Sequence, residues 1–429
     1  MMAAITAARQ GAGVILLDQN PKPGKKLLLT GNGRCNLTNT DPKLWEKYHS
    51  SQPGALAACV ATLQHSMDTD ATIAFFEHMG LLTIVKDGYV YPLSNTSESV
   101  LHVLERAMER VGIKRKYANR ITSLSFDHAS ALWEIRTDTY TYQADKVILA
   151  CGSKACPETG SDGSGYALAA KVGHGIIRPV PALTGLRCDL KGFEKAAGCR
   201  CRARVTVCDP ETKETVSDVG QVQWNRDGIA GVVVFQVSGF VSERLADRKK
   251  VMPELDLLPD LTVEQATAFI REQWEQSGPP DPARPGQHLS GLERSGMLTE
   301  LLRGMLPAKL AVCVGKVFEK RYAAGTNVSK RSTCKPTARA VSSPDAADVA
   351  AFLKSVKIPV TGVRGFAQAQ VCRGGVSLSE IDPETFESKI APGLFFAGEI
   401  LDADGPCGGY NLQWAFSSGY VAGMSAGQR

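Results

Sequence analysis

Residues 393–423 read GLFFAGEILDADGPCGGYNLQWAFSSGYVAG, and this stretch carries most of the functional signal in the chain. Its apolar run at 394–397 predicts a short buried strand, which Gly398 closes. The carboxylates of Glu399, Asp402 and Asp404 follow directly. Hydrogen-bond acceptors are therefore expected to cluster at the end of this strand.

A glycine pair and a helix come next. Gly408 and Gly409 let the backbone approach a ligand closely, and residues 411–421 are expected to form a helix. The amides at a helix start lack partners within the helix and carry partial positive charge. Such a site fits a flavin nucleotide, because a carboxylate can accept hydrogen bonds from ribityl or ribose hydroxyls while the helix stabilises a reduced isoalloxazine. The alternative is a strand, turn and helix that only complete an α/β sheet.

Composition sets the broad class of protein. The chain has 429 residues, enough for two or three domains, and its 43% hydrophobic and 22% charged content indicates a globular protein. A net charge of +5 does not require a nucleic-acid partner. The chain contains no apolar run long enough to span a bilayer and no visible secretory leader, which predicts a cytoplasmic protein whose 12 cysteines are reduced.

Cys188, Cys199, Cys201 and Cys208 lie close together in sequence, but their spacing is a poor zinc signature, so we expect no metal.

The N-terminus has the pattern of half a βαβ unit. A small-residue helix to about Arg9 precedes a glycine turn and the strand 14–17, which ends at Asp18. In a dinucleotide-binding fold an acidic residue at this position takes ribose hydroxyls, and a first strand and glycine loop precede the helix. Both are missing here. We expect the true start to lie upstream; the alternative is a protein without that strand and its pyrophosphate site.

A second informative loop covers residues 19–39. Its prolines and Gly24 disfavour regular structure, and Lys25 and Lys26 supply charge. Gly31-Asn32-Gly33-Arg34-Cys35-Asn36 combines flexible backbone with hydrogen-bond donors. Such a loop can wrap an anionic ligand, whereas the alternative is a surface turn with solvated lysines. Cys35 is either a redox thiol or, as is more common, a packed one.

These stretches carry a resemblance. GKKLLLTGNGRCNLTN (24–39) and the stretch 393–423 resemble the paired signatures of the BaiN-like flavoproteins, also called the aminoacetone oxidase family of FAD-binding enzymes. KVILACGSKACPETGSDGSGYALAAKVGH (146–174) and VTGVRGFAQAQVCRGGVSLSEIDPETFESKIAPG (360–393) are similar to the segments between them. Cys151 stands where the family more usually has threonine. The resemblance implies an α/β protein with a Rossmann-like FAD-binding domain, here apparently without its amino-terminal strand and glycine loop, and a small helical domain. Short β-rich segments predict an inserted β-barrel or sandwich in addition.

The intervening elements follow from local patterns. Helices are predicted at 69–79 and at 97–111, the second capped by Ser97, with a hairpin at 81–91 between them. Residues 113–144 predict three strands, suiting the small antiparallel sheet of such flavoproteins, and Arg120 and Ile121 are adenine contacts by resemblance. Strand 147–150 leads to Gly152, which permits close approach to the cofactor. Cys151 and Cys156 have a spacing that also occurs in redox disulfides, but the pair follows a strand, where spacing alone does not predict a bridge.

Beyond residue 179 the pattern becomes β-rich and then helical. Strands are expected at 203–208 and 231–237, a Pro/Gly-rich linker at 277–287, and helices at 310–322 and 345–354. We therefore expect residues 1–178 and 357–429 to form the FAD-binding domain, residues 179–251 and 330–356 a β-rich insertion, and residues 252–329 a helical insert.

The leading functional hypothesis is an FAD-dependent oxidoreductase that acts on a small organic molecule, with NAD(P)H or oxygen as redox partner. The alternative is a non-catalytic flavin-binding or redox-sensing protein, or an inactive truncated one. Flavin chemistry requires no obligatory catalytic side chain, although Tyr410 and Cys407 are near enough in sequence to donate a proton. The candidate cofactor-binding residues are Asp18, Lys25, Asn32, Gly33, Arg34, Cys35, Asn36, Ile121, Gly152, Gly398, Glu399, Gly408, Gly409, Tyr410 and Asn411.

Overall fold

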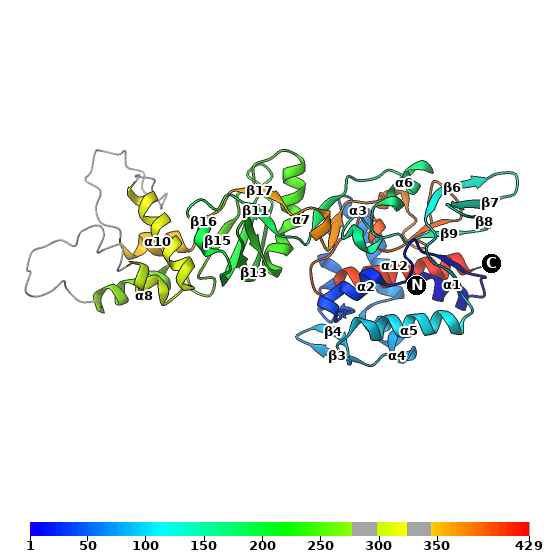
Figure 1. Cartoon of the computed structure of the whole chain (residues 1–429), viewed down its shortest axis with the longest axis horizontal. Coiled ribbons are helices and arrows are strands. Elements are labelled where there is room, and N and C mark those ends of the chain that lie inside the picture. The colour runs from blue at the N-terminus through cyan, green and yellow to red at the C-terminus, as the bar shows by residue number, and fades with distance from the viewer. Residues whose placement is uncertain (277–297, 324–344, 429) are drawn as a thin grey trace, which may run out of the picture. The chain divides into compact units, whose positions relative to one another are not determined.

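The computed structural model describes residues 1–276, 298–323 and 345–428 (Figure 1). It divides into two compact units, the first made of residues 1–183 and 365–429 and the second of residues 184–364. The second unit is thus an insertion within the first. The predicted linker at 277–287 and the predicted domain boundary near residue 330 lie outside the described residues, and the division into three parts stays a prediction.

The first unit is a mixed α/β structure, as the predicted fold class requires. Its helices and strands are α1 (Met2–Arg9), β1 (Ile15–Leu17), α2 (Lys25–Leu29), β2 (Thr38–Asn39), α3 (Pro53–Ser66), α4 (Thr69–His78), β3 (Thr83–Lys86), β4 (Tyr89–Pro92), α5 (Ser97–Arg110), β5 (Lys114–Lys116), β6 (Ile121–Asp127), β7 (Leu132–Thr137), β8 (Thr141–Ala144), β9 (Val147–Leu149), α6 (Ser164–Lys171), β10 (Val180–Ala182), β18 (Val371–Arg373), β19 (Leu394–Phe396) and α12 (Tyr410–Gly427). The unit contains two parallel ladders: β1 pairs with β5, and β19 pairs with β9. Strand β19 is fully buried, as its apolar run predicts.

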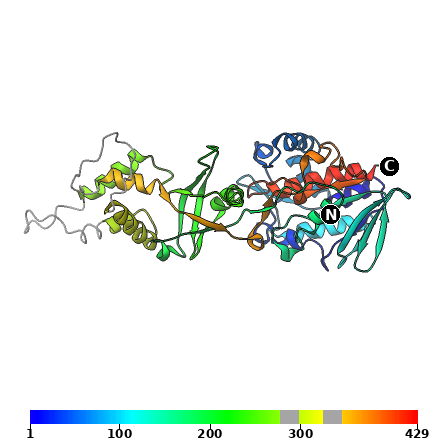
Figure 2. The same ribbon diagram turned by 90° about the horizontal axis from the view of Figure 1, so that it is seen from above.

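Helices α1 and α12 lie side by side in both views (Figures 1 and 2). Glycines at four-residue spacing on α12 make this contact possible, because a Cβ on Gly423 would lie 2.5 Å from the Ala3 carbonyl oxygen and one on Gly427 would lie 2.8 Å from that of Ala7. Small residues on both helices therefore allow the two backbones to approach closely. The predicted small-residue helix ends at Arg9, as expected.

Smaller antiparallel sheets complete the first unit. Strands β3 and β4 form the predicted hairpin, which turns at Asp87 and Gly88 with φ of 53° and 84°. Strands β6, β7 and β8 form the predicted three-stranded sheet. The predicted cap of α5 is wrong: Thr96 occupies the cap position, and the Ser97 hydroxyl instead donates to the Leu28 carbonyl over 3.0 Å.

The second unit is built on one antiparallel sheet, drawn in green in Figure 1. Its elements are β11 (Leu186–Cys188), β12 (Arg200–Cys208), β13 (Thr215–Trp224), β14 (Gly228–Ala230), α7 (Val232–Ala246), β15 (Glu254–Asp256), α8 (Val263–Gln276), α10 (Ala308–Ala323), α11 (Ala346–Leu353), β16 (Val356–Lys357) and β17 (Val360–Val363). The seven strands run in the order β16-β15-β12-β13-β14-β11-β17. The sheet closes on itself, as the predicted barrel requires, because β16 and β17 at the two ends of this order belong to one stretch, residues 356–363. Between them, the Ile358 amide donates to the Pro253 carbonyl on the side of β15, and the Asp189 amide next to β11 donates to the Pro359 carbonyl.

The predicted strand at 231–237 is wrong, because these residues open helix α7. The valine run favours a strand on local propensity. Its buried members, Val233, Val234 and Val237, continue at Phe240 and Val241, which is the spacing of one helix face. Burial of that face against the sheet outweighs the β-propensity of valine. Among the described helices, none combines the length and the apolar character that crossing a bilayer requires.

Candidate active site

The two signature segments, far apart in sequence, meet in the first unit. The Asn39 side-chain amide donates to the Gly408 carbonyl over 2.9 Å. A Cβ on Gly409 would lie 2.5 Å from the Thr38 carbonyl oxygen, and both glycines have positive φ, 119° and 95°. Glycine is therefore required where the C-terminal turn touches strand β2.

The loop before β2 has a backbone suited to ligand binding. Gly31, Asn32, Gly33 and Cys35 all have φ between 55° and 83°. These left-handed residues form a tight turn, in which the Cys35 amide donates to the Thr30 carbonyl over 3.0 Å and the Arg34 amide to the Gly31 carbonyl over 3.3 Å. A Cβ on Gly33 would meet no atom within 4 Å, so this side of the loop has space beside it.

Asn36 provides a test of whether a flavin fits here. Its side chain is buried, and within the described part of the chain its Oδ1 has no hydrogen-bond partner. An unpaired buried carbonyl is costly unless a donor reaches it. The ring N–H or sugar hydroxyls of a flavin are such donors, so the orphaned oxygen and the open side at Gly33 fit the predicted group.

Arg34 and Cys35 have local roles in this loop. The Arg34 Nε donates to the Gly31 carbonyl over 3.1 Å, and its guanidinium lies 5.2 Å from the ring centroid of Tyr91. The Cys35 side chain is fully buried, and burial raises the pKa of its thiol to about 12. This burial favours the packed alternative for Cys35.

Helix α12 begins at Tyr410, directly after Gly409. The Tyr410 hydroxyl donates to Asp41 Oδ2 over 2.8 Å, and burial, followed by this bond, raises its pKa to about 12. The Asn411 side chain accepts from the Gly405 amide over 2.9 Å and donates to the Gly405 carbonyl over 2.7 Å. The Asn411 side chain thus holds the turn before the helix, whereas the Tyr410 side chain reaches Asp41, and the backbone amides of the first helical turn are left for a ligand.

Glu399 lies at the end of β19, where the sequence places it. Its Oε2 accepts from Lys26 Nζ over 2.5 Å and from the Ser153 hydroxyl over 3.2 Å. Gly398 is fixed on the same turn, since its amide donates to the Ser418 hydroxyl over 2.9 Å. Lys26 is thus the partner of the carboxylate, whereas Lys25 Nζ donates to the Glu158 carbonyl.

Asp18, Ile121 and Gly152 form a second group. The Asp18 carboxylate accepts from the Asn20 amide over 2.9 Å. A Cβ on Gly152 would lie 2.9 Å from the Ser161 hydroxyl, and Ile121, the first residue of β6, packs against a buried cluster of the first unit. Beside Ile121, the Arg120 guanidinium donates to Asp162 Oδ2 over 2.8 Å.

The segment 152–162 connects the two groups of predicted residues. Thr159 and Gly160 accept hydrogen bonds from the side chains of Asn20 and Gln19, beside Asp18. Ala155 and Ser153 contact Lys26 and Glu399 on the other side. The bridging role of this segment and the ion pair between Lys26 and Glu399 were not predicted from the sequence. The two consecutive lysines of the 24–39 signature are the sequence feature that could have indicated the ion pair.

The cysteines give no redox pair or metal site in the described residues. Cys151 and Cys156 are both free thiols, so the predicted spacing forms no disulfide. Within the described ranges, no group of three or more His, Cys, Asp or Glu side chains lies close enough together to hold a metal.

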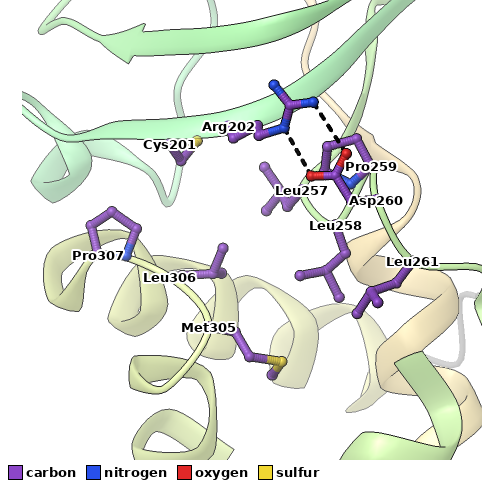
Figure 3. A pocket seen from close by; sticks show the side chains of 10 residues that line it. All are labelled: Cys201, Arg202, Leu257, Leu258, Pro259, Asp260, Leu261, Met305, Leu306 and Pro307. Atoms are coloured by element: carbon purple, nitrogen blue, oxygen red, sulfur yellow. Dashed lines mark hydrogen bonds and ion pairs between the residues drawn. The ribbon is translucent and has the colours of Figure 1, made fainter. Parts of the chain in front are cut away.

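A separate cavity of about 270 Å³ lies in the second unit (Figure 3). Its walls are mainly apolar, and at one side the Arg202 guanidinium pairs with the Asp260 carboxylate over 2.8 and 3.1 Å. The residues that line it are Cys201, Arg202, Leu257, Leu258, Pro259, Asp260, Leu261, Met305, Leu306 and Pro307. None of the predicted cofactor residues belongs to it.

Comparison with known proteins agrees with the resemblance seen in the sequence. A profile of the HI0933-like protein Rossmann domain matches residues 1–425. The chain is 35% identical to the 3-dehydro-bile acid delta(4,6)-reductase of Clostridium scindens, over 100% of this chain and 97% of that one. It is 26% identical to the ribosomal RNA dihydrouridine synthase of Haemophilus influenzae, over 99% and 95% of the two chains.

Among solved structures, the 3-ketosteroid-delta4-(5alpha)-dehydrogenase of Rhodococcus jostii is similar over 100% of this chain and 94% of that one, with 16% identity and a TM-score of 0.45. The full-length sequence matches confirm the predicted flavoprotein family and, with it, its class of FAD-dependent oxidoreductases. The chain belongs to the HI0933-like family of Rossmann-domain proteins.

Proposed function

We propose that this chain uses FAD to reduce a carbon–carbon double bond conjugated with a carbonyl group in a small organic molecule. The observation that carries the proposal is the contact between residues 38–39, shortly after the 31–36 loop, and the glycine turn 408–409 that precedes α12, in a chain that is 35% identical over its whole length to a bile acid reductase. That relative's name describes double bonds next to a 3-oxo group, which is a conjugated enone.

Different residues would bind different parts of the cofactor. Glu399 and Asp18 would accept hydrogen bonds from its sugar hydroxyls, and the Asn36 carbonyl oxygen would receive a donor that it lacks among the described residues. The first amides of α12 would stabilise negative charge on the pyrimidine side. When bound, the flavin supplies hydride to the substrate after reduction by NAD(P)H.

A spectrum and an anaerobic reduction test the proposal. The purified chain, reconstituted with FAD where necessary, should be yellow and should bleach on anaerobic addition of NADH or NADPH. A 3-dehydro-Δ4,6 bile acid should then restore the colour without oxygen. Colour that returns only with air would indicate an oxidase, and colour that never bleaches would favour the flavin-binding or redox-sensing alternative. A chain that refuses FAD would overturn the proposal.

A second candidate is modification of ribosomal RNA, and the match to a dihydrouridine synthase over 95% of that protein favours it. The double bond that is reduced in uridine is also conjugated with a carbonyl, so both candidates need the same flavin chemistry. They differ in the size and charge of the substrate. Mass spectrometry of unmodified ribosomal RNA, incubated with the reduced protein, would detect dihydrouridine if this candidate is right.

A further inference from the structure

The β3–β4 hairpin of the first unit exposes a cluster of large apolar side chains (Figure 1). Leu82, Ile84, Tyr89 and Leu93 are 66%, 47%, 37% and 56% exposed. Single exposed apolar side chains are common on protein surfaces, whereas a contiguous group of them is typical of a binding surface. These four side chains, together with that of Tyr91, are called the hairpin face below.

Strand pairing places the members of the hairpin face on one side of the ladder. Ile84 is paired with Tyr91, and Leu82 lies opposite Leu93, whose amide donates to the Leu82 carbonyl over 2.8 Å. Directly paired residues of an antiparallel ladder share a side, and successive residues alternate between the two sides. The hairpin face is therefore one apolar strip, and the four residue steps from Leu82 to Lys86 make it about 14 Å long.

One end of the hairpin face adjoins the candidate active site. A Cβ on Gly408 would lie 2.7 Å from Tyr89 Cε1, so the Tyr89 ring packs against the glycine turn that precedes α12. The ring centroids of Tyr89 and Tyr91 are 6.5 Å apart. The proposed function places the pyrimidine side of the flavin at the start of α12. A ligand on the hairpin face would thus have one end beside the cofactor.

Two exposed cations lie beside the apolar strip. The Arg34 guanidinium lies 5.2 Å from the ring centroid of Tyr91, and Lys86 is paired with Tyr89 in the ladder. In the parts of the chain that the structure describes, Arg34 donates one side-chain hydrogen bond, to the Gly31 carbonyl, and neither cation has a carboxylate partner. Their positive charge favours an anion, while the strip between them favours a hydrocarbon body.

We propose that the hairpin face binds the apolar body of the substrate, an amphipathic anion with a rigid hydrocarbon skeleton, and that Arg34 and Lys86 bind its anionic group. The inference rests on the proposed function and adds to it the surface that selects the substrate. The packing of Tyr89 on the glycine turn favours this occupant over a bilayer, because it joins the strip to the cofactor site. A second copy bound face to face would bring like charges together.

Ile84→Thr tests the apolar strip, and Val85→Thr is its matched control. Val85 is the next residue on β3 and is 53% exposed, but it belongs to the opposite side of the ladder. Both changes keep a β-branched side chain, so the strand propensity is retained. Binding of a 3-dehydro-Δ4,6 bile acid to each oxidised, FAD-loaded protein is measured by equilibrium dialysis, below the micelle concentration and without NADPH.

We expect Ile84→Thr to weaken this binding about five- to tenfold, the effect of losing roughly half of the contact area of an isoleucine side chain. Val85→Thr should change it by less than about twofold. The affinity for FAD and the rate of flavin reduction by NADPH should be the same in both variants as in the wild type.

The methyl ester of the same bile acid tests the two cations. The wild type should bind the acid about three- to fivefold more tightly than the ester, which is the size of an exposed ion pair. The double variant Arg34→Gln, Lys86→Gln should bind the two compounds equally. This ratio compares two ligands on one protein, so a change in FAD affinity does not alter it.

Equal effects of Ile84→Thr and Val85→Thr would overturn the inference, as would a wild type that does not bind the bile acid. Sedimentation with phosphatidylglycerol vesicles that Ile84→Thr alone abolishes, with bile-acid binding unchanged, would identify a membrane surface as the occupant instead. A dimer that Ile84→Thr alone dissociates would identify a second copy. A wild type that binds the bile acid through Ile84, but whose reduced flavin the compound cannot reoxidise, would refute the proposed reaction and support the binding surface.

Discussion

The contact between Gly409 and Thr38 gives the most direct test of the site geometry. Replacing Gly409 with alanine puts a Cβ 2.5, 2.6 and 2.8 Å from the carbonyl oxygen, carbonyl carbon and Cα of Thr38. These are backbone atoms, so strand β2 must move. The left-handed φ of 95° adds strain of about 1–3 kcal/mol, and the overpacking adds about 1–3 kcal/mol more.

Gly11 provides the matched control. Its φ is also 95°, but a Cβ there would meet no atom within 4 Å. Gly11→Ala therefore carries a comparable backbone strain without the collision. We expect Gly409→Ala to lower the free energy of unfolding of the first unit by about 1–3 kcal/mol more than Gly11→Ala does, or about 5- to 150-fold in the opening equilibrium.

Hydrogen–deuterium exchange of the slowest amides in β19 and α12 measures this difference in the cofactor-free protein. An absorbance titration with FAD measures its consequence, since displacement of β2 should also separate the loop from the helix start. Equal destabilisation by the two substitutions would show that the two signature segments do not touch as described.

Three further predictions concern single side chains. Glu399→Gln should weaken FAD binding by about tenfold through loss of one charge-assisted hydrogen bond, measured by absorbance titration, and unchanged affinity would remove its assigned role. Burial lowers the pKa of His174 below its usual value of 6.5, opposed by Glu380, so the unfolded chain binds more protons. Stability should therefore fall as the pH drops below about 6.5, and His174→Gln should flatten this dependence in urea unfolding at a series of pH values. Cys35 should resist alkylation in the folded protein while the exposed Cys208 reacts, as peptide mass spectrometry would show.

Much of the site could be predicted because its signals are local. An apolar run followed by a carboxylate places Glu399 at a strand end, and paired glycines place a close backbone approach at Gly408 and Gly409. The adjacent helix start follows from the same pattern. These features depend on residues that are neighbours in the chain, so their spacing is readable.

The partners across the fold could not be predicted in the same way. Whether Lys25 or Lys26 reaches Glu399 depends on the direction of the two side chains on α2, which spacing alone does not settle. The helix α7 shows the same limit, because valine propensity favours a strand and only the packed sheet decides for the helix.

The acidic segment shows why residue type alone overstates the number of ligand contacts. Three carboxylates were expected as acceptors at the strand end, and each one holds a different part of the chain. Asp402 Oδ2 accepts from the Ser50 and Ser51 hydroxyls over 2.8 and 2.6 Å, and Asp404 pairs with His49. Glu399 pairs with Lys26 through Oε2, so its other oxygen is the one that a sugar hydroxyl can use.

The buried carboxylates of Asp402 and Asp404 therefore affect the candidate site by fixing the positions of the residues that they bind. Asp402 and Asp404 attach consecutive residues of the 49–51 loop to the segment that leads into α12, so this loop and the helix start are positioned by one short stretch. Breaking a buried charged contact leaves the remaining hydrogen-bond partners unsatisfied and loosens the segments that the contact joined. Loss of either aspartate should thus loosen the start of α12 more than it weakens the proposed hydrogen bonds to the sugar hydroxyls, whereas loss of Glu399 should do the reverse.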